Sequence, residues 1–179
     1  MQDYFPQLLQ TLGNLDTAEN IKTLQNAAQG HPGDARPLLL IAAQFAEQGR
    51  VDEAEAAYIT ALERRPDFAI ARFQLGLLQF STGRAATACA TWARLDTHSS
   101  SAALRLFKKG MACLAVDDFA DAASLIQQGI NANQENAPLN DAMQRLADEI
   151  TRCQRTLANT ATPAPDAGHY LFSAYRNLH

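Results

Sequence analysis

Residues that commonly perform chemistry are few in this chain, and their spacing fits no recognisable active site. The four histidines are His31, His98, His169 and His179. The residues around them do not have the spacing of metal ligands. The serines at 99–101 have no histidine or acid in an arrangement that would activate a nucleophile. We therefore predict no catalytic residue, no metal and no cofactor, and expect that the protein is not an enzyme.

The three cysteines indicate packing rather than redox chemistry. Cys89, Cys113 and Cys153 are odd in number and far apart, which favours small buried hydrophobic residues over a disulfide or a metal site. No basic segment precedes the first apolar residues, so no secretory signal is expected. No apolar run reaches the roughly 18 residues that a membrane span needs. These features predict a cytoplasmic protein without membrane insertion.

Composition and charge are those of an ordinary globular protein. The chain has 179 residues, of which 47% are hydrophobic and 19% charged, and its net charge is −4. Lysine and arginine are scattered along the sequence, and no basic stripe is evident that would neutralise phosphates. Nucleic-acid binding is therefore not expected.

A period of 34 residues indicates a repeat architecture. The recurring residues are Ala54, Ala88 and Ala122; Tyr58, Trp92 and Ile126; Gly49 and Gly83; and Pro32 and Pro66. Small residues recur as well where two helices would approach closely, at Ala42, Gly76 and Gly110. A unit of this length can bury its apolar face only against its neighbours, so the period predicts an all-α array of helix pairs.

Proline, glycine and charge mark the helix boundaries. In the unit that begins at residue 35, Pro37 suits the first turn of a helix, and Gly49 marks the turn that follows this helix. The acidic pair at 52–53 favours the start of a second helix, which Pro66 ends. Apolar residues at steps of three and four over 139–157 predict one more helix with a single buried stripe.

The residues at these positions resemble the tetratricopeptide repeat family. The unit 35–68 has the family pattern throughout, at Leu38, Ile41, Ala42, Phe45, Ala54, Tyr58, Ala61 and Pro66. The two later units keep part of it. Their departures from large apolar or aromatic residues are Arg72, Gln79, Lys109 and Cys113. The resemblance implies a right-handed α-solenoid of antiparallel helix pairs, closed by a C-terminal capping helix.

The repeat frame divides the chain into consecutive segments. Residues 1–34 are predicted to form a degenerate N-terminal helical repeat, and the three repeats are expected at 35–68, 69–102 and 103–136. The capping helix is expected at 137–157, a linker at 158–168, and an apolar tail segment at 169–179.

The resemblance also implies a concave face that binds protein partners. In this family that face is built mainly from the first helix of each unit, and here its positions are almost all apolar, with Arg36 an exception. The residues expected to line a peptide-binding groove are Leu39, Phe73, Leu77, Phe80, Phe107, Met111 and Leu114. The implied function is a scaffold or chaperone-like adaptor that holds an apolar peptide or helix. The alternative is that these side chains close onto each other and leave no groove.

The apolar tail is a candidate occupant of that groove. Leu171, Tyr175 and Leu178, with Phe172 beside them, have the spacing of a helix that anchors in an apolar groove. The extended linker would span roughly 36 Å, which lets the tail fold back or reach a second copy. The tail would then occlude its own groove, or fill that of another copy in a structural homo-oligomer, which is the alternative function. A frayed end is the remaining interpretation.

Overall fold

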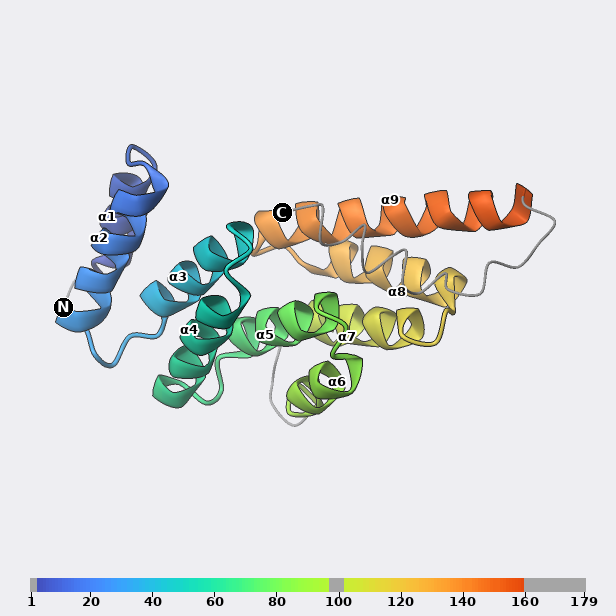
Figure 1. Cartoon of the computed structure of the whole chain (residues 1–179), viewed down its shortest axis with the longest axis horizontal. Coiled ribbons are helices and arrows are strands. Elements are labelled where there is room, and N and C mark those ends of the chain that lie inside the picture. Colours follow the sequence, from blue (N-terminus) through green and yellow to red (C-terminus); the bar gives the residue numbers. More distant parts are fainter. Residues whose placement is uncertain (1–2, 97–101, 160–179) are drawn as a thin grey trace. The chain divides into compact units, whose positions relative to one another are not determined.

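The computed structural model describes residues 3–96 and 102–159, and these residues form helices joined by turns and loops (Figure 1). This part of the chain has nine α-helices and no strand. They are α1 (Phe5–Leu12), α2 (Thr17–Gly30), α3 (Arg36–Glu47), α4 (Val51–Arg64), α5 (Ala69–Ser81), α6 (Ala85–Ala93), α7 (Ala102–Leu114), α8 (Phe119–Ala132) and α9 (Ala137–Asn159). The prediction of an all-α fold is confirmed, and the succession of helices is consistent with an α-solenoid.

Several predictions concern residues outside the described ranges. These are the tail residues Leu171, Phe172, Tyr175 and Leu178, and the histidines His98, His169 and His179. Occlusion of the groove by the tail therefore remains a prediction.

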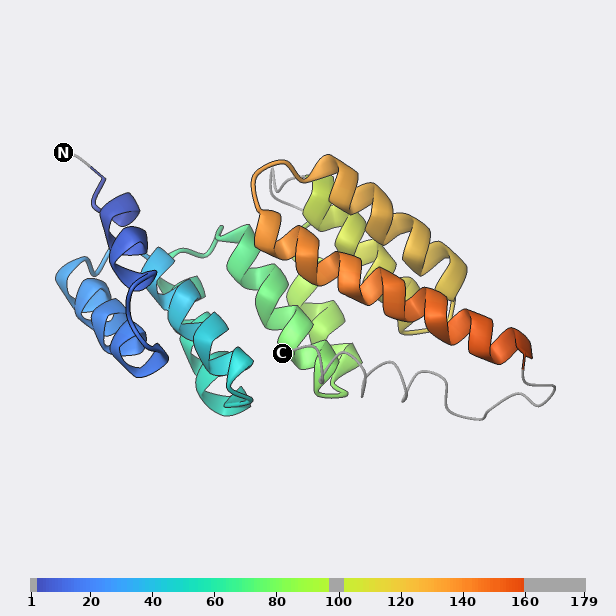
Figure 2. The ribbon, with the colours of Figure 1, turned by 90° about the horizontal axis from the view of Figure 1, so that it is seen from above.

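The chain forms two compact units, residues 1–71 and residues 72–179. The first unit contains α1–α4, the second contains α6–α9, and the boundary lies in the first turn of α5. In the first unit α2 packs against α3, and α3 against α4. In the second unit α7 packs against α8, and α8 against α9, which can be followed in Figure 2.

The turns inside the three predicted repeats share one backbone geometry. The turn residue has a positive φ in each, +70° at Gly49, +79° at Gly83 and +59° at Asp117. The residue after it donates its backbone N–H five positions back, which is the Schellman ending of a helix. These bonds join Arg50 to Phe45 at 2.9 Å, Arg84 to Gln79 at 2.9 Å, and Asp118 to Cys113 at 3.0 Å. Asp117 thus adopts the conformation that glycine adopts in the two earlier turns.

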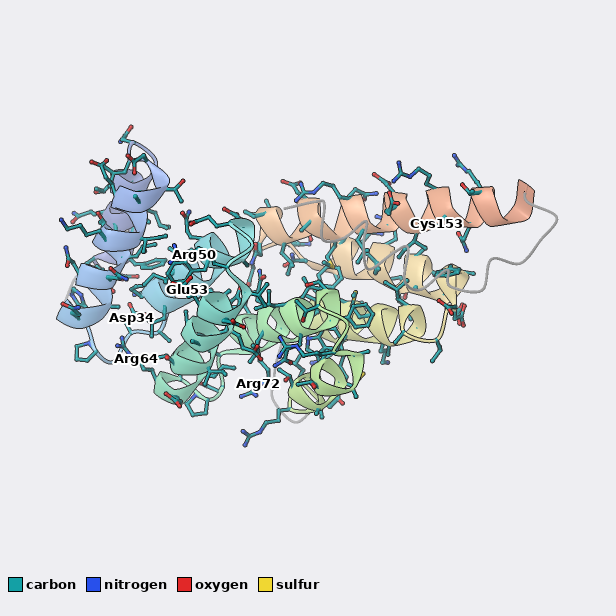
Figure 3. The ribbon with its side chains drawn as sticks, viewed as in Figure 1. Asp34, Arg50, Glu53, Arg64, Arg72 and Cys153 are labelled. Carbon is teal, nitrogen blue, oxygen red and sulfur yellow. The ribbon has the colours of Figure 1, made fainter. Side chains whose placement is uncertain are left out.

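Small residues bring the helices of the first unit together. The buried side chains of α2, α3 and α4 include Leu24, Ala28, Ile41, Ala42, Phe45, Ala54, Tyr58 and Ala61. Ala42 on α3 and Ala54 on α4 are completely buried, as the repeat pattern predicts. Arg64, in the last turn of α4, donates from Nη1 to the carbonyl oxygen of Ala28 at 3.0 Å, and Figure 3 labels this arginine. Because the last carbonyls of a helix lack partners within it, this bond caps α2.

The interior of the second unit is built around Trp92. Its indole ring is completely buried, with its centroid 5.9 Å from that of Phe73 and 5.9 Å from that of Phe80. The indole Nε1 donates to the backbone carbonyl oxygen of Phe73 at 3.0 Å. A buried indole N–H needs such a partner, because an unsatisfied donor in the interior is costly. The bond therefore fixes α6 against α5.

Glycines allow α7 and α8 to approach each other. A Cβ atom at Gly110 would lie 2.9 Å from Cγ1 of Ile126, and one at Gly129 would lie 2.5 Å from Cδ1 of Phe107. Both distances are shorter than real carbon contacts, so the two helices need glycine at these positions. The prediction of a close approach at Gly110 is confirmed.

An asparagine cluster makes the turn between α8 and α9, where the repeat proline is missing. Asn133 donates from Nδ2 to Oδ1 of Asn140 at 2.8 Å, and Asn140 returns a bond to the carbonyl oxygen of Asn133 at 2.8 Å. The side chain of Asn136 accepts from the backbone N–H of Leu139 at 3.0 Å in the first turn of α9. From there α9 buries Leu139, Met143, Leu146 and Ile150, four residues of the stripe predicted over 139–157, while Cys153 of the same stripe is half-buried.

Candidate peptide-binding face

Six of the seven predicted groove side chains are buried, and all six lie in the second unit. They are Phe73, Leu77 and Phe80 on α5, and Phe107, Met111 and Leu114 on α7. None of them is more than 5% exposed. The rings of Phe73 and Phe107 lie against each other with their centroids 5.9 Å apart. These side chains therefore close onto each other and present little surface to a partner.

On α7 the buried face differs from the one that the repeat pattern specifies. The buried residues of this helix are Ala103, Leu104, Phe107, Gly110, Met111 and Leu114. Lys109 is exposed and Cys113 is half-buried, although the pattern has large apolar residues at both positions. A lysine is costly to bury without a partner, so the helix turns its fully apolar side inward instead. That side contains the residues predicted to line the groove.

Leu39 is the one predicted groove residue that stays partly accessible. It lies in the middle of α3 and is half-buried, as are Ala43 and Ala46 on the following turns. These three residues occupy the positions that the family resemblance assigns to the concave face of the predicted repeat 35–68. Together they form an apolar strip, which we call the α3 wall. It is the part of the predicted face that a partner could reach in this structure.

Two polar residues are buried among the apolar ones of α5. Gln79 is 4% exposed and accepts a hydrogen bond from the hydroxyl of Thr91 on α6 at 2.7 Å. Arg72 is 7% exposed, and burial together with the nearby Arg94 guanidinium lowers its pKa. Both residues were visible in the sequence as departures from the repeat pattern. Their burial was not predicted, because a polar residue at a core position is exceptional.

A charged and aromatic cluster lies at the start of α3. Arg36 donates from Nη1 and Nη2 to the two carboxylate oxygens of Asp3, each at 2.8 Å. It also donates from Nη2 to Oδ2 of Asp34 at 2.8 Å, and its guanidinium carbon lies 4.3 Å from the centre of the Phe5 ring. Tyr4 stacks on His31 with the ring centroids 3.6 Å apart. None of the residues of α1 is buried, and this cluster links the start of α1 to the start of α3.

The cluster shifts the acidities of its members. Hydrogen bonds from Arg36 lower the pKa of Asp3 to about 2, while burial and the bond to Asp34 raise the pKa of Tyr4 to about 12. Burial alone would raise the pKa of Asp34, but its bonds from Arg36 hold it below the ordinary value. Hydrogen bonds to Asp3 and Asp34 in turn raise the pKa of Arg36. These shifts are those of an ion-pair network that stabilises structure.

The described residues show no cluster of possible metal ligands. Over residues 3–96 and 102–159, no three histidine, cysteine or acidic side chains gather as metal ligands would. Burial raises the pKa of the Cys113 and Cys153 thiols, which disfavours the reactive thiolate. Within the same ranges, none of the helices combines the length and the apolar character that crossing a bilayer requires.

Comparison with known families agrees with the repeat pattern. Residues 39–102 match the family model of the tetratricopeptide repeat, a family whose members generally mediate protein–protein interactions. A comparison with curated proteins found no match. The matched segment includes α4, α5 and α6 and most of α3, with the α3 wall and the Trp92 interior. Residues 39–102 of the chain are therefore recognised as tetratricopeptide repeats.

Proposed function

We propose that the chain is a scaffold or chaperone-like adaptor that binds a segment of another protein through the first helices of its repeats. The observation that carries the proposal is the α3 wall, a partly exposed apolar strip at the concave positions of a recognised tetratricopeptide repeat. Apolar surface of this kind gains free energy when a partner removes it from water. Leu39 is its largest side chain, and full burial of a leucine contributes about 1.5–3 kcal/mol.

The six buried groove residues have a different part in the proposal. Phe73 and Phe107 meet inside the second unit, so they support α5 and α7 rather than offering surface. A partner would contact them only if the second unit opened. Opening would expose several large apolar side chains at once, and exposing each would cost about 1.5–3 kcal/mol of free energy. Contact through Leu39 requires no such change.

The tail segment is the internal competitor in this proposal. Leu171, Phe172, Tyr175 and Leu178 have the spacing of an anchoring helix, and the linker tethers them to the same chain. A tethered competitor lowers the apparent affinity for an external ligand by the fraction of molecules that it occupies. Binding in trans instead would give the homo-oligomer.

Selection of displayed peptides on the full chain would supply a ligand for the test. The affinity of a selected peptide is then measured for the wild type, Leu39→Glu and Ile59→Glu. Ile59 on α4 is 44% exposed and provides a matched apolar-to-acidic control away from the α3 wall. We expect Leu39→Glu to weaken binding about tenfold or more, because an anchor residue is lost. Ile59→Glu should bind as the wild type does.

Equal affinity of the two variants, or selection of no peptide, would refute binding at the α3 wall. Ending the chain at residue 159 tests the tail separately. Tighter peptide binding by the shortened chain supports competition in cis. A fall in molecular mass on shortening, measured by light scattering, supports the homo-oligomer.

A further inference from the structure

Arg36 lies beside the α3 wall and is the charged residue among the positions that the family resemblance assigns to the concave face of repeat 35–68. It precedes Leu39 by three residues in α3, so the two side chains lie on the same side of the helix, one turn apart. Both residues are half-buried. A segment that covers Leu39 therefore comes within reach of the Arg36 guanidinium.

The guanidinium of Arg36 is held in position by Asp34. Its Nε donates to the two carboxylate oxygens of Asp34 at 3.1 and 3.0 Å, and its Nη2 donates to Oδ2 at 2.8 Å. Asp34, which Figure 3 labels, has a side chain only 17% exposed and also accepts from the hydroxyl of Tyr4 at 3.0 Å. Because Asp34 is itself fixed, it orients the edge formed by Nη1 and Nη2 to bind a second carboxylate.

In this structure that edge binds Asp3. The two carboxylate oxygens of Asp3 accept from Nη1 and Nη2, each at 2.8 Å, which is the paired geometry by which arginine recognises a carboxylate. The contact is open to solvent, since the side chain of Asp3 is 52% exposed and that of Arg36 is 33% exposed. An exposed ion pair is weak because water and salt screen it, so the carboxylate of a partner can take the place of Asp3.

The helix that follows Asp3 is also loosely packed. None of the residues of α1 is buried. In the repeat frame, Leu8 on α1 and Asn20 on α2 stand where the three later units have alanine or glycine. The Oδ1 atom of Asn20 is buried, and in the part of the chain that the structure describes it has no hydrogen-bond partner. The α1–α2 pair thus lacks the small residues that bring the later helices together, and the release of Asp3 would disturb little packing.

We propose that Arg36 binds an acidic side chain of the partner segment whose apolar residue contacts Leu39, and that Asp3 occupies this site when no partner is bound. The inference rests on the proposed function and adds the chemistry that selects the segment. The carboxylate that fills the site here belongs to an aspartate side chain within a chain, so Asp or Glu within a segment is the ligand that the geometry favours. Asp3 is then a competitor at the start of α1, and the α3 wall supplies the apolar contact.

The test uses two displayed peptide libraries that are identical except for one fixed position, which is Glu in the first library and Gln in the second. Both are selected on the full chain. Each enriched peptide is then made in a Glu form and a Gln form, and fluorescence anisotropy measures the affinity of both forms for the wild type and the variants.

The variants separate the site from its competitor. Arg36→Gln removes the site, and Asp3→Asn removes the competing carboxylate. The control Asp141→Asn makes the same change of charge as Asp3→Asn at an exposed position of α9. Arg36→Lys keeps the charge without the paired geometry, and it covers the case in which Arg36→Gln prevents folding, which circular dichroism would show.

We expect the Glu form to bind the wild type about tenfold or more tightly than the Gln form, because only the Glu form accepts paired, charged hydrogen bonds. Arg36→Gln should remove this difference, and Arg36→Lys should reduce it. Asp3→Asn should tighten binding of the Glu form about threefold or more, because the site is no longer occupied in cis. The affinity of the Gln form should not change in Asp3→Asn, and Asp141→Asn should leave both forms unchanged.

Equal affinity of the Glu and Gln forms for the wild type, or no gain by the Glu form in Asp3→Asn, would overturn the inference. If the same peptides still lose affinity in Leu39→Glu, the proposed function stands and the acidic contact alone is refuted. Enrichment of neither library, or equal binding by the wild type and Leu39→Glu, would contradict both proposals.

Discussion

The indole ring of Trp92 fills the space that a side chain at Gly76 would occupy. A Cβ atom at Gly76 would lie 2.1 Å from the indole Nε1 and 2.4 Å from Cε2. The ring has little freedom to move away, since Nε1 is also bonded to the carbonyl oxygen of Phe73. The small residue of the second repeat and the aromatic residue of its second helix are therefore one packing unit.

Gly76→Ala is expected to destabilise the protein by about 1–3 kcal/mol, because the added methyl group overpacks a fixed ring. Gly30→Ala is the matched control: it ends α2, and a Cβ atom there meets nothing within 4 Å. The control should be neutral or stabilise by up to about 1 kcal/mol, because alanine favours helix. Urea unfolding of both variants provides the comparison, and similar stabilities would show that Trp92 adapts.

Asp117→Gly is expected to stabilise the chain by about 0.5–1 kcal/mol. An L-residue in the left-handed region costs about 1–2 kcal/mol relative to glycine, and the greater entropy of unfolded glycine offsets part of the gain. Gly83→Ala, at the equivalent turn with φ of +79°, should destabilise by a similar amount. Thermal melting of the two variants checks the prediction. If both shift the melting temperature in one direction, the turns are not equivalent.

Phe107→Ala is expected to cost about 3–5 kcal/mol, as truncation of a fully buried aromatic side chain does. Leu39→Ala should cost less than about 1.5 kcal/mol, because the leucine is only half-buried. Chemical denaturation of the two variants measures their free energies of unfolding. A large loss marks a residue that holds the second unit together, and a small loss marks one that is available to a partner. A loss at Leu39 as large as that at Phe107 would assign Leu39 to the core.

Acid is expected to weaken the anchoring of α1. The pKa of Asp3 falls from 3.8 to about 2 on folding, so the folded state favours the charged carboxylate. Its contribution is complete above about pH 5 and is lost as the pH falls towards about 2. The amide chemical shifts of α1, followed by NMR over this range, should change less with pH in Asp3→Asn than in the wild type. Asp141→Asn, at an exposed position on α9, controls for the change of charge. A wild-type pH response in Asp3→Asn would exclude this ion pair as the anchor.

The repeat pattern predicted most of the fold, because its residues are those that a helix end or a close contact between two helices requires. Gly49 and Gly83 end helices at fixed spacing, and Ala42, Gly76 and Gly110 mark close approaches. The third turn was harder to predict, since Asp117 replaces the glycine and its side chain alone does not reveal a positive φ. The asparagine cluster between α8 and α9 was also missed, because its bonds join residues seven positions apart.

The candidate site was less predictable than the fold. Family positions place Phe107 on a concave face, yet Lys109 and Cys113 at the usual core positions turn α7 so that this face becomes interior. The position in the repeat does not determine which neighbour covers a side chain. That depends on how all the helices of the second unit pack, and on the cost of burying a lysine.

The sequence by itself determined the periodic helix pairs, their turns and their close contacts, because each follows from the size and backbone preference of single residues. Only the tertiary structure decided that Phe73 and Phe107 face each other, that Leu39 remains accessible, and that Lys108 meets Asp96. The physical reason is that an apolar side chain gains the same free energy against a neighbouring helix as against a partner. Which of the two covers it is a property of the assembled helices.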